Sequence, residues 1–333
     1  MNAVLSHSKD SNRSIVGLAL SLSIPSLAIL QKYFHIVGVI AYIAIVFIAL
    51  YLLTKYRYLI AKLASKASTR QIYGLAAITF LILLITFFLI YPKAGSRTYG
   101  HGSDCDDAIN IATTRLLHGQ YPYYFRTYLG NAVSPLPGSL ILAIPFVLLG
   151  NSAYQNIFWL LMFFIAMKFY LEDERSALLL LWIILALSPV VLHQIVTGID
   201  YLSNSLFIML FIMWLVKSTA RTEPGNWKII IPAILLGIGF STRANFLLLL
   251  PLIFFALTKT AGWQKAILYT GIICFTFALV TFPFYLYDPK SFSPLLTKYQ
   301  LKQFESIIPY IDLIIPLITG IIALLLALFQ PVH

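Results

Sequence analysis

Long uninterrupted apolar stretches constrain the fold of this chain more than any other feature of its sequence. The stretches at about Gln71–Tyr91 and Ala266–Leu286 each reach the roughly 20 residues that a helix needs to cross membrane hydrocarbon. Hydrophobic residues make up 60% of the 333 residues and charged residues 11%, whereas soluble domains average about 45–50% and about 25%. Hydrocarbon offers no water to backbone N–H and C=O groups, and these stretches lack the alternation of barrel strands. We therefore predict an all-α polytopic membrane protein with a single transmembrane domain over residues 1–333.

The basic residues set the expected orientation of the chain. The formal net charge is +11, and the Lys and Arg residues collect in short loops between apolar stretches. Residues 55–70 contain five basic residues and no acidic one, which places this loop in the cytoplasm by the positive-inside rule. The loop at 92–137 then lies on the outer side of the membrane. The charge is explained by topology and anionic headgroups, so we expect membrane lipids and not nucleic acid as partners.

The apolar stretches predict a bundle of about nine transmembrane helices. Gly138–Leu149 would extend only about 18 Å as a helix, so we expect it to be a half-depth helix and not a crossing. The expected spans are Ile15–Leu30, Ile36–Thr54, Gln71–Tyr91, Tyr154–Leu171, Ala177–Val191, Tyr201–Val216, Ala266–Leu286 and Pro309–Phe329, together with a helical hairpin.

That hairpin consists of two short apolar segments, Ile229–Phe240 and Phe246–Thr258, separated by the polar sequence STRAN. Both segments adjoin basic loops at their far ends, so we predict a broken-helix hairpin over 229–258 whose tip points outward and carries Arg243. Broken helices are tolerated in membranes where they line a cavity. A second outer loop is expected over 287–308.

The first outer loop, 92–137, gathers the polar chemistry of the chain. It contains Asp104, Asp106 and Asp107, which are three of the 12 acidic residues, and two of the six histidines, His101 and His118. Charge beside a bilayer costs free energy, so such a cluster is a candidate site. A short amphipathic helix, Asp106–His118, is expected to lie in the membrane interface.

Each candidate in this loop has an alternative interpretation. Asp104 is the candidate general base, with Asp106 or Asp107 as the alternative base. The three acids taken together are also the sequence of a capped helix start. Asp106 and Asp107 could instead hold a divalent cation, although two adjacent acids are weak grounds for one. His101 and His118 could bind phosphate or assist proton transfer, and a histidine in a loop is more often solvated.

Outside the acidic cluster, Arg243 is the main candidate, because a guanidinium binds phosphate in bidentate geometry and stabilises a departing anion. Its alternative role is to snorkel toward the membrane interface. Asp200, close to His193, either completes the same cavity or caps the following helix. Tyr123 is a substrate contact or an anchor in the headgroup layer.

Three segments resemble the GT-C superfamily of polytopic glycosyltransferases. They are SDCDDAINIATTRLLHGQYPYY, SPLPGSLILAIP and GIGFSTRANFLLLLP. The resemblance covers roughly 91–283 and is strongest to the mannosyltransferases that use polyprenol-phosphate mannose. It implies a GT-C-like bundle with interfacial and half-depth helices, with Asp104 as catalytic base and Arg243 as phosphate ligand. His101 or His118 would be helpers. Apart from the resemblance, we expect Asp107, His101, His118, Tyr123 and Asp200 to be substrate-binding residues.

The resemblance further implies a hexosyltransferase that moves a sugar, such as mannose, from a polyprenyl-phosphate carrier to a lipid, glycan or protein acceptor. The expected location is the bacterial plasma membrane, with the active site facing the cell envelope. No cofactor is expected beyond the lipid-linked donor, and a divalent cation remains an open alternative. A transporter or lipid-linked-sugar flippase without transferase activity is the main alternative, and a non-catalytic scaffold is the third.

Overall fold

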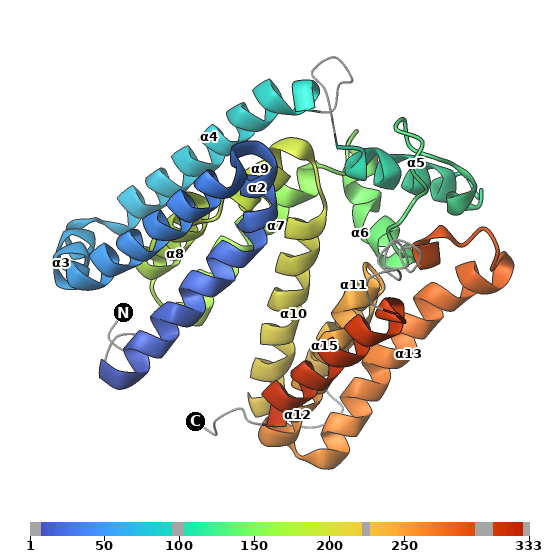
Figure 1. The fold of residues 1–333 in the computed structure, drawn as a ribbon. Coiled ribbons are helices and arrows are strands. Elements are labelled where there is room, and N and C mark those ends of the chain that lie inside the picture. The colour runs from blue at the N-terminus through green and yellow to red at the C-terminus, as the bar shows by residue number, and fades with distance from the viewer. Residues whose placement is uncertain (1–7, 95–102, 222–226, 297–308, 329–333) are drawn as a thin grey trace. The chain divides into compact units, whose positions relative to one another are not determined.

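A computed structural model describes residues 8–94, 103–221, 227–296 and 309–328, and within these ranges every regular element is a helix (Figure 1). The only β pairing among them is an isolated bridge between Arg126 and Ala132. By length and composition, six described helices could cross a membrane, or up to seven if a bent pair is one span. An all-α, multi-pass membrane protein is therefore confirmed in outline, whereas the predicted number of about nine spans is not.

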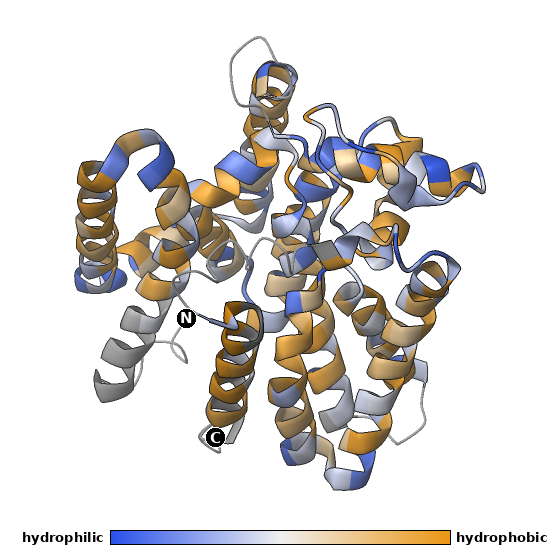
Figure 2. Ribbon diagram, turned by 45° about the vertical axis from the view of Figure 1, so that its right-hand side comes forward, coloured by the Kyte–Doolittle hydropathy of each residue, from blue (hydrophilic) through white to orange (hydrophobic). Residues whose placement is uncertain are grey.

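The contacts divide the chain into two compact units, of which the first comprises 1–102 and 156–202, and the second 103–155 and 203–333. The prediction of a single transmembrane domain stays a prediction. Figure 2 shows hydrophobic residues along the helices of both units, with hydrophilic residues gathered at helix ends and over the segment around α5.

Within its described residues, the first unit contains six helices. They are α2 (Ser8–Lys55), α3 (Arg57–Lys66), α4 (Thr69–Ala94), α7 (Tyr154–Leu171), α8 (Glu174–Leu187) and α9 (Pro189–Thr197). The helix α3 lies within the loop that the basic residues mark as cytoplasmic, where no helix was predicted.

The helix α2 is a hairpin with two arms. His35 has φ 54° and ψ −166°, which interrupts the helix at the turn predicted between Ile15–Leu30 and Ile36–Thr54. The Tyr42 hydroxyl donates to the Leu22 carbonyl at 3.1 Å, although 20 residues of straight helix would separate them by about 30 Å. The arms therefore fold back on each other (Figure 1), and Leu22, Leu30, Tyr42 and Val46 share one buried cluster.

The predicted span Ala177–Val191 is wrong in one respect, because the chain bends by 83° between α8 and α9. The break falls at Ser188, directly before Pro189. Proline lacks the N–H that would continue the helix and disfavours helical geometry in the residue before it, which accounts for the bend.

The second unit carries the segments with polar chemistry. Its elements are α5 (Cys105–Leu117), η2 (Pro122–Tyr124), α6 (Pro137–Leu148), α10 (Tyr201–Arg221), α11 (Trp227–Phe240), η3 (Ala244–Leu249), α12 (Leu250–Ala261), α13 (Trp263–Tyr287), η4 (Ser293–Leu296) and α15 (Ile311–Leu328). The half-depth helix predicted at Gly138–Leu149 corresponds to α6, which is too short to be counted as a span.

The predicted broken-helix hairpin, 229–258, corresponds to α11, η3 and α12. The break comprises Ser241 and Thr242 in a turn, followed by Arg243 in extended conformation. Both α11 and α12 pack against α13, and α11 also contacts α6. The break is thereby brought to the start of α6, beside the loop at 127–135. The predicted loop at 287–308 lies largely outside the described residues.

Candidate active site

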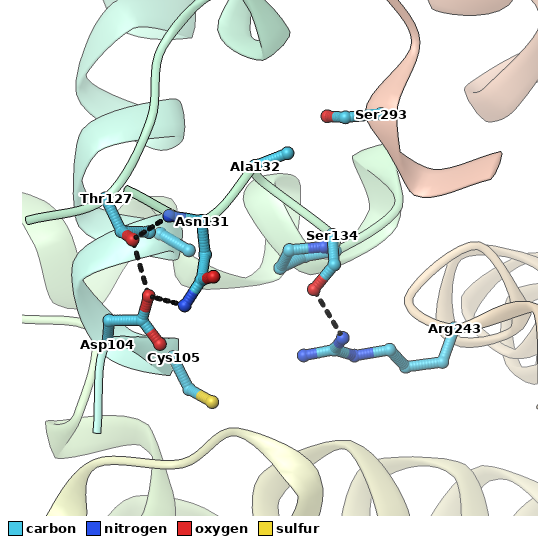
Figure 3. Close-up of a pocket in the computed structure, with 10 residues that line it drawn as sticks. Asp104, Cys105, Thr127, Asn131, Ala132, Ser134, Arg243 and Ser293 are labelled. Carbon is cyan, nitrogen blue, oxygen red and sulfur yellow. Dashed lines mark hydrogen bonds between the residues drawn. The ribbon is translucent and has the colours of Figure 1, made fainter. Parts of the chain in front are cut away.

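A pocket of about 250 Å³ lies within the second unit. This volume is just below the roughly 300–1,000 Å³ of pockets that hold drug-sized ligands, so it suits a small polar group. Four segments line it: the start of α5, the loop at 127–135, the break before η3, and η4. The lining residues are Asp104, Cys105, Ala108, Thr127, Asn131, Ala132, Ser134, Pro135, Arg243 and Ser293. Figure 3 shows Asp104 and Arg243 reaching into this space from opposite sides.

Asp104 occupies the N-cap position of α5 but does not cap it, because its side chain makes no cap hydrogen bond. Its Oδ2 instead accepts hydrogen bonds from the Thr127 hydroxyl and, at 2.8 Å, from the Asn131 side-chain amide (Figure 3). Both bonds from the described residues end on Oδ2, which leaves Oδ1 for a ligand. The alternative interpretation of Asp104 as a helix cap is therefore not supported.

A tight turn holds the two donors in place. The Thr127 N–H donates to the Asn131 carbonyl at 2.9 Å, and the Asn131 N–H donates to the Thr127 hydroxyl oxygen at 3.1 Å. Gly130 has φ +83°, a left-handed conformation that glycine adopts without strain. The turn is attached to α5 by the Tyr128 N–H, which donates to Asp107 Oδ2 at 2.9 Å. Asp107 therefore holds the loop and does not line the pocket.

Arg243 is half-buried, and one of its terminal nitrogens donates to the Ser134 hydroxyl at 3.3 Å (Figure 3). The two residues before it are held against the start of α6 by two backbone hydrogen bonds. Leu136 N–H donates to the Thr242 carbonyl at 3.1 Å, and Gly138 N–H donates to the Ser241 carbonyl at 2.7 Å. The guanidinium thus projects from a helix break that is anchored by backbone contacts.

Gly138 makes this anchorage possible. A Cβ at this position would lie 2.3 Å from the Ile238 carbonyl oxygen and 2.6 Å from the Ser241 backbone. No side chain fits at such a distance, so the two segments approach each other only because residue 138 is glycine.

Tyr123 is buried behind the pocket and does not line it. Its hydroxyl donates to the Pro135 carbonyl at 3.1 Å, and its ring packs edge-on against Phe292. Burial raises the pKa of Tyr123 well above 10, so the phenol stays neutral. Tyr123 therefore shapes the pocket wall and, in this structure, is not a direct substrate contact.

The neighbouring Tyr121 joins the loop to the end of α13. Its hydroxyl donates to the Phe284 carbonyl at 2.9 Å, and its ring stacks on Tyr287 at 5.0 Å. Burial, followed by the negative charge of Asp288, raises the pKa of Tyr121 to about 12. This attachment brings η4, and with it Ser293, to the pocket rim.

The remaining predicted site residues lie elsewhere. His118 is the C-cap of α5, where its Nδ1 is 2.7 Å from the Thr114 carbonyl oxygen, and it does not line the pocket. Asp106 is buried and does not line the pocket. His101 lies outside the described residues. Asp200 is a buried residue of the first unit, and its predicted role at the site stays a prediction.

The sequence interpretation missed four polar lining residues: Thr127, Asn131, Ser134 and Ser293. The first three lie in the loop predicted to be catalytic, but small polar residues are common in any turn. Ser293 had no signal, because only tertiary packing brings it near, through a 2.5 Å hydrogen bond from its hydroxyl to the Val133 carbonyl.

The pocket combines one carboxylate with one guanidinium among neutral hydroxyl and amide groups. Such a pair suits abstraction of a proton on one side and binding of an anion on the other. Within the described residues, no three His, Cys, Asp or Glu side chains are close enough together to hold a metal ion. The chain matches no protein-family model, no curated protein and no solved structure, so the resemblance to the GT-C superfamily stays a prediction that rests on its motifs.

Proposed function

We propose that this protein is a membrane-embedded glycosyltransferase that moves a sugar from a polyprenyl-phosphate carrier to an acceptor hydroxyl. The observation that carries the proposal is that Asp104 and Arg243, 139 positions apart in the chain, line one small pocket. A base and an anion-binding group on opposite sides are what displacement of a phosphate by an alcohol requires.

The reaction is a direct displacement at the anomeric carbon. Asp104 Oδ1 accepts the proton of the acceptor hydroxyl, while Thr127 and Asn131 hold the other carboxylate oxygen. The acceptor oxygen forms a bond to the anomeric carbon as the bond from that carbon to the phosphate oxygen breaks. The electron pair leaves with the polyprenyl phosphate, whose charge is stabilised by Arg243.

The partners follow from this chemistry. The donor is a polyprenyl-phosphate hexose, with mannose as the first candidate, and the acceptor is a lipid, glycan or protein of the cell envelope. The distribution of basic residues favours a pocket that opens on the outer side of a bacterial plasma membrane.

Transfer assays with Asp104→Asn test the proposal. Purified full-length protein in liposomes would be incubated with radiolabelled polyprenyl-phosphate hexoses and an extract of envelope acceptors. A general base contributes about 10²–10⁴-fold, so Asp104→Asn should lose at least about a hundredfold in turnover. Asp107→Asn is the matched control, because its amide oxygen still accepts the Tyr128 N–H, and its activity should stay near that of the unmodified protein.

Two results would contradict the proposal. Full transfer by a well-expressed Asp104→Asn variant would remove the general base. Movement of the labelled lipid across the liposome membrane without any glycosylated product would favour the flippase alternative.

A further inference from the structure

A groove lies on the first unit, at the junction of α3 and α4 and along the first turns of α4. It has a volume of about 510 Å³ and is lined by Lys66, Ala67, Gln71, Gly74, Leu75 and Ile78. All six residues belong to the first unit, so this groove is separate from the pocket that contains Asp104.

The end of the groove nearest α3 carries hydrogen-bond donors. Lys66 is the last residue of α3 and is exposed. The Gln71 side-chain oxygen accepts from the Ser68 N–H at 2.8 Å and from the Ser68 hydroxyl at 3.1 Å, so its amide nitrogen is left to donate to a ligand. The Lys66 ammonium and the Gln71 amide, both at this end of the groove, suit an anionic group with several acceptor oxygens.

The end of the groove farther from α3 is an apolar channel along α4. Gln71, Gly74, Leu75 and Ile78 have the spacing of one helix face. Leu75 and Ile78 are 39% and 54% exposed, so a large part of each side chain is open to a ligand. A Cβ at Gly74 would meet no atom within 4 Å, so the missing side chain leaves open space in this face.

The charge around the groove is positive. Lys55, Arg57, Lys62, Lys66 and Arg70 lie within 16 positions and include no acid. The α3 helix that carries most of them buries none of its residues.

Three acids, Glu172, Asp173 and Glu174, lie at the start of α8. Glu174 accepts a hydrogen bond from Thr69 at 2.8 Å, Asp173 caps α8, and Arg175 donates to the carbonyl of the lining residue Ala67 at 2.9 Å. None of the three acids lines the groove, and Arg175 adds a further cation. Clusters of four to eight basic residues directly beside a membrane helix attract anionic lipid headgroups.

We propose that this groove binds one anionic phospholipid. Its phosphate contacts Lys66 and the Gln71 amide, and one acyl chain lies over Gly74 along Leu75 and Ile78. The order of the groups, with donors at the start of the membrane helix and an apolar channel after them, matches a lipid whose head lies in the headgroup layer. This inference does not depend on the transferase activity.

Native mass spectrometry of the purified full-length protein tests the site, with phosphatidylglycerol and phosphatidylcholine as probes. Lys66→Gln should weaken binding of the first phosphatidylglycerol about fivefold, the factor that corresponds to the contribution of one lysine near an anionic surface. Gly74→Leu should reduce it at least as much by filling the channel. Both variants should leave phosphatidylcholine binding unchanged.

Two matched controls separate this site from general effects. Lys62→Gln removes the same charge from α3 at a position that does not line the groove, and it should retain phosphatidylglycerol binding. Gly271→Leu adds the same side chain to α13 at a glycine that also has open space, and it should have no effect. Equal losses in Lys62→Gln and Lys66→Gln would overturn the proposal in favour of diffuse attraction. Equal binding of the two lipids, or normal phosphatidylglycerol binding by Gly74→Leu, would also overturn it.

Discussion

At the scale of single residues, the central feature is the Asp104 carboxylate, which is hydrogen-bonded to a distant loop and not to the helix that it precedes. An aspartate at the start of a helix ordinarily accepts a hydrogen bond from its own first turn. Asp104 has that position, yet its Oδ2 is held by Thr127 and Asn131, 23 and 27 residues further along the chain. Because two donors hold Oδ2, the side chain is pre-organised, and Oδ1 keeps one position relative to a ligand in the pocket.

The Tyr121 phenol predicts a pH dependence of stability. Burial and the Asp288 carboxylate raise its pKa from 10 to about 12, so the folded protein keeps a proton that the unfolded chain loses. The resulting stabilisation is fully present below pH 10 and is lost as the pH rises to about 12. The unfolding midpoint of Tyr121→Phe should therefore fall less steeply over this interval than that of the unmodified protein, as measured by thermal unfolding. Tyr58→Phe, on exposed α3, is the control, and equal slopes for all three proteins would contradict the assignment.

At the scale of elements, the site depends on how the helix break meets the start of α6. Two backbone hydrogen bonds from Leu136 and Gly138 hold the break, and the Ser241 hydroxyl is 2.8 Å from that of Thr281 on α13. The polar groups that the break exposes are thus satisfied by neighbouring helices, which is the condition for irregular backbone in a membrane. Arg243 follows directly, so its direction is set by this junction.

Gly138→Ala should disturb the junction and the pocket together. The added Cβ would lie 2.3 Å from the Ile238 carbonyl oxygen, and overpacking of this kind costs about 1–3 kcal/mol. We expect a lower unfolding temperature and reduced transfer activity. Gly271→Ala is the matched control, because its Cβ meets no atom within 4 Å and alanine favours helix by up to about 1 kcal/mol. A Gly138→Ala variant as stable as the unmodified protein would show that the junction tolerates a wider separation.

At the scale of the whole molecule, each of the two units carries one candidate site. The second unit builds the polar pocket at the ends of its helices, and the first unit carries the groove beside α3. The α2 hairpin is counted as one helix but has two arms. One continuous helix of 48 residues would extend about 72 Å, more than twice the thickness of membrane hydrocarbon.

Cysteine labelling tests the predicted orientation of the protein. Cys105 lines the pocket, whereas Cys274 lies within the apolar helix α13. In intact cells that express the Cys274→Ser variant, a membrane-impermeant maleimide should label Cys105 if the pocket opens outward. The Cys105→Ser variant should stay unlabelled, because the remaining thiol lies in the middle of a candidate membrane span that a charged reagent does not enter. Labelling of Cys105 only after the cells are permeabilised would contradict the outward orientation.

The sequence alone determined that this chain is an all-helical membrane protein, because apolar stretches of this length have no other way to satisfy their backbone in hydrocarbon. It also located the polar loop, the short apolar helix α6 and the break that carries Arg243, since these are local interruptions of an apolar pattern. Only the tertiary structure decided which polar side chains meet. Thr127, Asn131 and Ser293 line the pocket, whereas Asp107 and His118 do not, because packing between distant segments and not local pattern sets where a side chain points.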